Sequence, residues 1–160
     1  MITAEYIVGF TDGEGCFYVQ IRTDYRIVLR YFITQRYDNK ELLDEIQKFF
    51  GVGYVHLKKQ EWGKEYRRFR RPTYVFEVTK QDDIQQVIVP FFRANHLLGN
   101  KHFSFEKFAK IADLVKDRQD TRLLSERELE LVSTLKRTMN VLNHSGSPDA
   151  ENPHVRWERE

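Results

Sequence analysis

The sequence predicts an α+β fold in which one antiparallel sheet carries helices on one side. Segments of helical periodicity alternate with pairs of strand-like segments, in the order helix, hairpin, helix, hairpin, helix. A chain of 160 residues is also long enough to bury a sizeable core within one domain. We expect this domain to span residues 1–142, including an extra C-terminal helix, and residues 143–160 to form a weakly ordered tail.

The first helix is expected to begin after Thr3, a favoured N-cap residue, and to run through Phe10. Gly9 has no Cβ, so a second helix could approach this one closely. Gly13 and Gly15 permit the sharp backbone turn that ends a helix. The first helix is therefore a candidate for tight pairing with another helix.

Two strand-like segments follow, at residues 16–23 and 27–36, with a short polar turn between them. In the first strand, Phe17, Val19 and Ile21 alternate with polar residues, and this period of two predicts one core face and one polar face. The polar face of the second strand is mixed, with arginines between apolar residues. Such a face fits a solvated antiparallel sheet or one that recognises DNA.

A capping pattern at residues 38–41 opens a second helix, which has an apolar stripe and closes at Gly51. The second hairpin pairs residues 54–59 with residues 73–79. Its long basic loop contains the sequence RRFRR at residues 67–71 and predicts an arm that orders on DNA, the alternative being a solvated linker.

Asp82 is expected to cap a third helix, which runs over residues 83–93 and breaks near Pro90. Lys101 begins a further helix, in which aromatic residues recur at helical spacing and are expected to belong to the core. The last helix begins at Ser125 with a capping box and has an apolar stripe, so it is expected to pack on the rest of the domain.

Positive charge is concentrated on the strand-like segments, although the formal net charge is only +2. Residues 54–80 contain eight basic and three acidic residues, and residues 16–36 contain four and one. Basic stripes of this kind are typical of phosphate binding. The single cysteine, Cys16, excludes an internal disulfide framework and a cysteine-based zinc cluster, which favours a reducing compartment. No apolar run approaches membrane-spanning length, so we expect no membrane partner.

The segment Ile7–Gly15, IVGFTDGEG, carries most of the functional information. Asp12 and Glu14 alternate with glycines, and a short D-G-E-G by itself fits a solvated helix stop. If two such helix ends met, their oxygen atoms would form the kind of site that Mg²⁺ prefers. The whole segment resembles, position by position, the motif of the LAGLIDADG homing endonucleases, with conservative changes such as Glu14 for the final Asp. The resemblance covers about residues 3–115.

The resemblance implies an αββαββα core, whose antiparallel sheet forms a curved saddle on double-stranded DNA. A single motif is typical of the homodimeric branch of the family, in which the motif helices join two copies. The implied activity is hydrolysis of both DNA strands across the minor groove of a long pseudo-palindromic site, as in intron homing. The dimer interface would then be formed by Ile7, Val8, Gly9 and Phe10.

The resemblance also implies roles in catalysis. Glu14 and the carbonyl group of Gly13 would bind Mg²⁺ at the scissile phosphates. Lys101 would stabilise developing negative charge, and Gln35 would order solvent. Glu14, Gln35 and Lys101 are therefore the candidate catalytic residues, whereas Asp12 is expected to support the motif turn.

Both hairpins are expected to contact DNA. Side chains with paired donors and acceptors recognise base edges, whereas basic side chains on phosphates position the protein without specifying sequence. The candidates for base recognition are Tyr18, Gln20, Arg22, Arg26, Arg30, Thr34, His56, Lys58 and Thr73. The candidates for phosphate contacts are Lys64, Arg67, Arg68, Arg70 and Arg71.

Two other kinds of protein fit the same residues. A non-cleaving relative, such as an RNA maturase or a transcription factor, would bind nucleic acid on the same sheet, and only a maturase would have RNA as a partner. A carboxylate beside phosphate would hinder such binding, so Glu14 argues against this alternative. The basic hairpins argue against a purely structural dimer. The expected location is intracellular, either in an organelle (chloroplast or mitochondrion) or in a prokaryotic cytoplasm.

Overall fold

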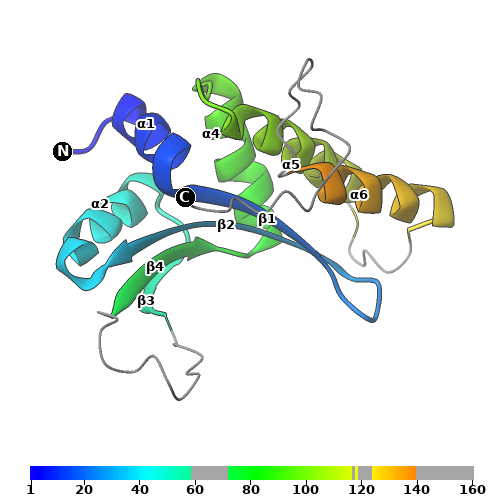
Figure 1. The fold of residues 1–160 in the computed structure, drawn as a ribbon, viewed down its shortest axis with the longest axis horizontal. Helices are drawn as coiled ribbons and strands as arrows, with labels where there is room; N and C mark the ends of the chain where they lie inside the picture. The colour runs from blue at the N-terminus through cyan, green and yellow to red at the C-terminus, as the bar shows by residue number, and fades with distance from the viewer. Residues whose placement is uncertain (59–71, 117, 119–123, 140–160) are drawn as a thin grey trace, which may run out of the picture.

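A curved four-stranded sheet organises the molecule. The computed structural model describes residues 1–58, 72–116, 118 and 124–139. The strands lie in the order β1-β2-β4-β3, and every neighbouring pair is antiparallel. Helices cover the convex face of the sheet, and no described helix covers the concave face (Figure 1). The predicted α+β fold, with a saddle-shaped sheet and helices on one side, is confirmed.

Helix α1 (Ala4–Glu14) begins where predicted, because the Thr3 hydroxyl accepts a hydrogen bond from the N–H of Tyr6. It continues past Phe10 into the acidic segment, so its predicted end is wrong. No left-handed glycine ends it, since Gly15 is extended, with φ −76° and ψ 158°. A glycine is needed there for space, because a Cβ would lie 2.6 Å from the Cγ2 atom of Thr11.

Strands β1 (Gly15–Ile21) and β2 (Ile27–Arg36) form the first hairpin. Their alternation is the predicted one, since Phe17 and Val19 are buried while Tyr18 is exposed. In the turn, the N–H of Tyr25, whose φ of 63° is left-handed, donates to the carbonyl of Arg22. This turn ends β1 two residues before the predicted boundary at residue 23.

A single 3₁₀ turn, η1 (Tyr37–Asn39), leads into α2 (Lys40–Phe50). Asn39 occupies the N-cap position within the predicted capping pattern at residues 38–41, but its side chain makes no capping hydrogen bond, and its amide donates to Oε1 of Gln35 at 3.0 Å instead. The helix closes as predicted at Gly51, whose φ is 68°.

Strands β3 (Tyr54–Leu57) and β4 (Thr73–Val78) form the second hairpin. β4 pairs with β2 as well, so it lies inside the sheet and β3 lies at an edge. Residues 59–71 of the connecting loop, including the predicted phosphate contacts, lie outside the described residues.

Three helical segments follow one another directly, namely α3 (Gln81–Asp83), η2 (Ile84–Ile88) and α4 (Val89–Ala94). The N-cap position belongs to Lys80, so the cap predicted at Asp82 is wrong. η2 is a π-helical turn, and only Val89 separates it from the proline at position 90. Because proline has no N–H and crowds the preceding turn, this wider turn allows helix to continue where a break was expected.

Helices α5 (Lys101–Val115) and α6 (Glu126–Thr138) complete the helical layer. α5 begins at the predicted residue, and its aromatic side chains belong to the core. The Phe17 ring, for example, lies 5.2 Å from Phe105 and 5.3 Å from Phe108 between centroids. The predicted capping box at the start of α6 is present. None of the described helices is both long and apolar enough to cross a membrane.

Candidate active site

The C-terminal end of α1 presents an exposed carboxylate. Glu14 is the last residue of the helix, and its side chain is exposed. Within the described ranges, its carboxylate has no hydrogen bond or ion pair. It is therefore available to an external ligand.

Lys101 reaches from the start of α5 to the carbonyl groups on either side of Glu14. Its Nζ atom donates to the Gly15 carbonyl at 2.5 Å and lies 3.5 Å from the Gly13 carbonyl. Partial negative charge at the end of α1 favours a cation at this position. The structure thus brings Glu14 and Lys101, two candidate catalytic residues that are far apart in the sequence, to the same end of α1.

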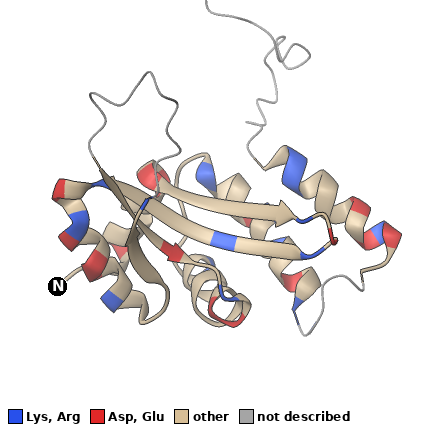
Figure 2. Cartoon of the chain, turned by 90° about the horizontal axis from the view of Figure 1, so that it is seen from below, with Lys and Arg blue, Asp and Glu red and all other residues tan. Residues whose placement is uncertain are grey.

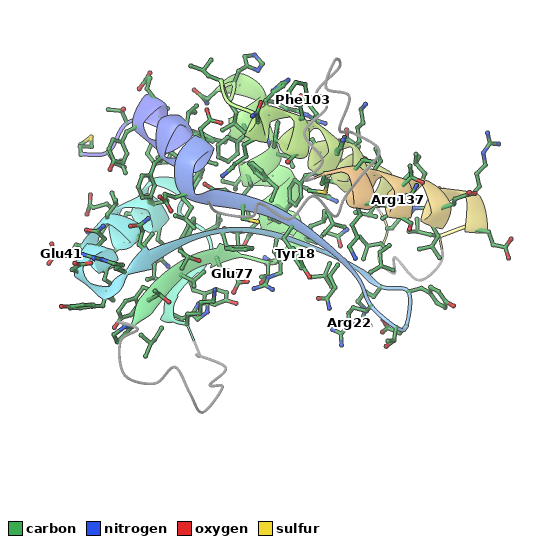
Figure 3. The ribbon with its side chains drawn as sticks, in the orientation of Figure 1. Tyr18, Arg22, Glu41, Glu77, Phe103 and Arg137 are labelled. Carbon is green, nitrogen blue, oxygen red and sulfur yellow. The ribbon has the colours of Figure 1, made fainter. Side chains whose placement is uncertain are left out.

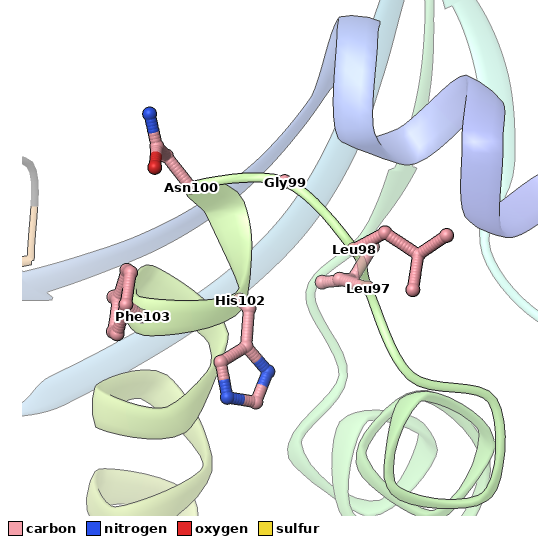
Figure 4. A pocket seen from close by; sticks show the side chains of 6 residues that line it. All are labelled: Leu97, Leu98, Gly99, Asn100, His102 and Phe103. Atoms are coloured by element: carbon pink, nitrogen blue, oxygen red, sulfur yellow. The ribbon is translucent and has the colours of Figure 1, made fainter.

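Asp12 fixes the segment that leads to Lys101. Its Oδ2 atom accepts hydrogen bonds from the N–H groups of Leu98 at 2.8 Å and Gly99 at 3.1 Å. Contact is close here, because a Cβ on Gly99 would lie 3.1 Å from Oδ1 of Asp12. This segment also lines a shallow pocket beside the end of α1 (Figure 4). Asp12 therefore holds a segment that sequence analysis did not connect with the motif, and its expected support of the motif turn stays a prediction.

Gln35 lies on β2, two residues beyond Ile33, which pairs with Gly15. Its side-chain oxygen accepts the hydrogen bond from Asn39 already described. In the described part of the chain, no hydrogen bond joins Gln35 to Glu14 or Lys101. Its role in ordering solvent stays a prediction.

Cys16 connects the end of α1 to the concave face. Burial raises the pKa of its thiol, while the nearby positive charges of Lys101 and Arg30 act to lower it. The half-buried thiol is therefore close enough to Lys101 and to Arg30 of β2 to be influenced by both charges. Sequence analysis had treated this residue only as an indicator of compartment.

The candidate base-recognition residues gather on or beside the concave face. Cross-strand pairing puts Tyr18 opposite Arg30. His56 and Thr34 lie on either side of Val75 of β4, which pairs with both. Figure 3 shows Tyr18 below the sheet and Arg22 at the hairpin tip, and Figure 2 shows basic residues along the strands and at that tip. The remaining candidates are arranged as follows: Gln20 and Thr73 lie on strands, Arg26 lies in the turn, and Lys58 follows β3.

A buried acid, Glu77, lies among these residues and is only 4% exposed. Its Oε1 atom accepts hydrogen bonds from both Nε and Nη2 of Arg30, and its Oε2 atom accepts one from the Tyr54 hydroxyl at 3.1 Å. Arg30, a candidate for base recognition, is therefore paired with an acid that sequence analysis did not connect with it. The only sequence signal for Glu77 is its alternation with Thr73 and Val75 along β4.

The exposed side of α1 differs from the predicted dimer interface. Ile7 and Val8 are 0% and 8% exposed because they pack into the core of their own chain, so their side chains are not available to a partner. Tyr6, Gly9, Phe10 and Gly13 form the exposed or partly exposed stripe instead, at the helical spacing of a single face. The rings of Tyr6 and Phe10 stack 5.8 Å apart, and a Cβ on Gly9 would meet no atom of the described residues within 4 Å.

Comparison with protein families decides the relationship. A family model described as LAGLIDADG endonuclease matches residues 7–112. The chain belongs to this family. The match runs from the motif helix to α5 and so includes both Glu14 and Lys101.

Two curated relatives of this LAGLIDADG chain come from Neurospora crassa. The chain is 30% identical over 134 residues to the probable intron-encoded endonuclease 2 and 26% identical over 118 residues to the probable intron-encoded endonuclease 3. These matches cover 84% and 71% of this chain but only 26% and 20% of the relatives. The LAGLIDADG chain thus spans about a quarter of the first relative and a fifth of the second.

Solved structures share the fold. The homing endonuclease I-TnaI is 25% identical, with a TM-score of 0.72, and the match covers 89% of this chain and 91% of that one. I-SmaMI bound to uncleaved DNA in the presence of calcium is also 25% identical, with a TM-score of 0.72. That match covers 88% of this chain but 45% of I-SmaMI, so the LAGLIDADG chain corresponds to about half of it.

Proposed function

We propose that this chain is a site-specific double-strand DNA endonuclease of the intron-homing type, acting as a homodimer. One observation carries the proposal: the exposed Glu14 carboxylate lies at the end of α1, and Lys101 binds the carbonyl groups on both sides of it. An acid and a cation at one helix end suit hydrolysis of a phosphodiester, because the acid can hold a metal ion and the cation can stabilise negative charge. The family and the DNA-bound I-SmaMI support DNA as the substrate.

The oxygen donors fit Mg²⁺ as part of a shared site. Glu14 and the Gly13 carbonyl are donors of the kind that Mg²⁺ takes, together with water and substrate phosphates. Among the described residues, no group of three His, Cys, Asp or Glu side chains could complete a site within one chain. When bound, Mg²⁺ would activate water and neutralise charge on the scissile phosphate.

The other two candidate residues act without binding the metal. The Lys101 ammonium has three N–H donors and is only partly buried, so it can turn one toward a phosphate oxygen while it keeps the Gly15 carbonyl. Gln35 is oriented through its oxygen, and its NH₂ group is proposed to order solvent near the cleaved bond.

A dimer supplies the second acid that cleavage of two strands requires. The stripe of Tyr6, Gly9, Phe10 and Gly13 allows two α1 helices to pack closely, so that two copies of Glu14 meet near a two-fold axis. The match to about half of I-SmaMI supports two such units on one DNA. Two arched sheets side by side would cover a pseudo-palindromic site about two helical turns long.

Selection of a target tests this function. The protein is incubated with a library of randomised duplexes, the bound sequences are recovered, and the enriched duplex is incubated with the protein with and without Mg²⁺. We expect a long pseudo-palindrome to be enriched, and both strands to be cut only when Mg²⁺ is present. Enrichment without cleavage would favour a non-cleaving relative, and absence of any enriched sequence would contradict the proposed function.

A further inference from the structure

We infer that Glu77 is a positioning residue for DNA recognition: it fixes the Arg30 guanidinium so that the free end of this group recognises a guanine in the major groove. The inference rests on the proposed function, because it concerns how the concave face selects its target. It adds a residue to the recognition surface and assigns a base to Arg30.

The hydrogen bonds to Glu77 occupy one edge of the Arg30 guanidinium and leave its far end without a hydrogen-bond partner among the described residues. Nε and Nη2 of Arg30 both donate to Oε1 of Glu77. A guanidinium has five N–H donors in a planar fork, so the two N–H groups at its far end, on Nη1 and Nη2, stay available in one plane. Guanine offers two acceptors, N7 and O6, on its major-groove edge, and this pair matches such an end.

Burial puts the acid beneath the arginine. The side chain of Arg30 is 36% exposed, whereas that of Glu77 is 5% exposed. Figure 3 shows Glu77 on the concave side of β4. Arg30 therefore lies between Glu77 and the position that DNA would occupy on this face. A DNA base that approached this face would contact the guanidinium before the carboxylate.

Two aromatic rings keep the guanidinium in the same region. The Cζ atom of Arg30 lies 5.7 Å from the centroid of the Tyr18 ring and 5.6 Å from that of Phe32. Each contact is a cation–π interaction that favours this location of the group. Tyr18 is the cross-strand neighbour of Arg30, and Phe32 is that of Glu77, so the sheet register itself assembles the four side chains.

The second carboxylate oxygen is also engaged. Oε2 of Glu77 accepts the Tyr54 hydroxyl at 3.1 Å and lies 4.0 Å from Nε2 of His56. With both oxygens held, the carboxylate cannot turn away from Arg30 without losing a hydrogen bond. The orientation of Arg30 is thus set before any DNA arrives.

Specificity explains this arrangement better than stability does. A buried ion pair is often no more stabilising than apolar residues of the same volume. A free arginine on this face would bind any phosphate, whereas an arginine neutralised by Glu77 adds little to non-specific attraction. The pair keeps the Arg30 guanidinium in a fixed orientation, and hydrogen bonding to a base edge depends on that orientation.

Base preference and salt dependence together test the inference. The wild-type protein and Glu77→Gln are each equilibrated with a randomised duplex library in EDTA, and the bound DNA is sequenced. We expect a guanine at one position of each half-site for the wild type, favoured about tenfold or more, and a preference below about threefold for the variant. Because Arg30 then keeps an uncompensated charge, the slope of log affinity against log salt should steepen by about one.

Two further variants control the experiment. Glu45→Gln makes the same chemical change in the exposed pair with Lys48 on α2, away from the concave face, and should alter neither guanine preference nor salt slope. Arg30→Met with Glu77→Met removes the pair without leaving a buried charge, so this double variant should melt as a folded protein and lose the same guanine. Thermal melting of each variant verifies its fold.

The outcomes separate the two proposals. Retention of guanine preference by Glu77→Gln would overturn the role of Glu77, and its retention by the double variant would overturn recognition of guanine by Arg30 and with it the inference; either result would leave the endonuclease proposal intact. Enrichment of a different base at the position controlled by Arg30 would overturn the assignment of guanine. If the wild-type protein enriches no sequence, the proposed function fails and this inference fails with it.

Discussion

Thr11 is a fully buried polar residue in the motif helix, and its hydroxyl shares a 2.7 Å hydrogen bond with the hydroxyl of Tyr31 on β2. Replacing Tyr31 with Phe leaves the Thr11 oxygen buried and unpaired. We therefore expect Tyr31→Phe to lower the free energy of unfolding by about 1–3 kcal/mol, measured by urea denaturation. The exposed tyrosine of the first hairpin provides the control, since Tyr25→Phe should be neutral. Equal stability of wild type and Tyr31→Phe would show that this bond does not hold α1 to the sheet.

At Glu14 the proposed chemistry depends on one carboxylate. Glu14→Gln should abolish cleavage of the selected duplex because the amide binds Mg²⁺ poorly, and it should preserve or tighten DNA binding because a negative charge near phosphate is removed. End-point cleavage and gel-shift assays on one duplex measure the two effects. Glu41→Gln, on the exposed side of α2, is the matched control (Figure 3). Cleavage by Glu14→Gln at the wild-type rate would rule out this metal site.

Individual residues differ in how far the sequence could predict them. Glu14 and Lys101 were assigned from the motif and its surroundings, and the structure brings them to the same helix end. The pairing of Arg30 with Glu77 could not be predicted, because it depends on contact between β2 and β4, which are not consecutive strands. Alternation along a strand assigns a face to a side chain but does not identify its partners across the sheet.

Among the elements, the segment before α5 depends on the end of α1. Asp12→Ala removes the acceptor for two N–H groups, so Lys101 should lose its fixed approach to the Gly15 carbonyl. Misplacement of a catalytic group by about 1 Å can cost up to about 100-fold in rate, and we expect a loss approaching that size in single-turnover cleavage with little change in DNA affinity. Asp113→Ala, which removes an exposed ion pair on α5, should leave the cleavage rate unchanged. A comparable loss in both variants would indicate a general effect on α5.

Periodicity predicted the elements of this fold better than their ends. Alternation located both strands of the first hairpin because one of their faces is buried, and helical spacing located α2 and α5 for the same reason. The end of α1 was missed because glycine and acidic residues favour turns locally, whereas packing of Thr11 against the sheet keeps the helix intact through Glu14. The break expected at Pro90 was wrong because a proline by itself predicts a helix end, whereas the wider π-helical turn lets the helix continue there.

For the whole molecule, the assembly proposal makes Gly9 decisive. Among the described residues, a Cβ at this position meets nothing within 4 Å, so Gly9→Leu should leave the monomer folded. In a close helix pair the added side chain would overpack the interface, at a cost of about 1–3 kcal/mol or more, and should convert the dimer to monomer. Sedimentation and circular dichroism together measure these effects, with Ser133→Leu on the exposed side of α6 as the control. An active monomer would contradict the homodimer.

The basic loop makes a prediction about binding by the whole molecule. If Arg67, Arg68 and Arg70 neutralise phosphates, changing all three to Ala should reduce the slope of log affinity against log salt by roughly one for each arginine removed, for every DNA sequence alike. Binding titrations over a range of salt concentrations measure this slope. Gln20→Ala should behave differently, relaxing base preference at one position of each half-site. An unchanged slope in the triple variant would mean that the loop is a solvated linker.

The direct passage from α1 into β1 has a mechanical consequence. The helix ends at Glu14 and the strand begins at Gly15, so no hinge separates the group proposed to cut DNA from the sheet proposed to recognise it. If bound DNA bent the sheet, α1 would tilt together with β1. A duplex that fits the sheet poorly would therefore displace Glu14 from the scissile phosphate, and fidelity of cutting would follow from the rigidity of one peptide junction.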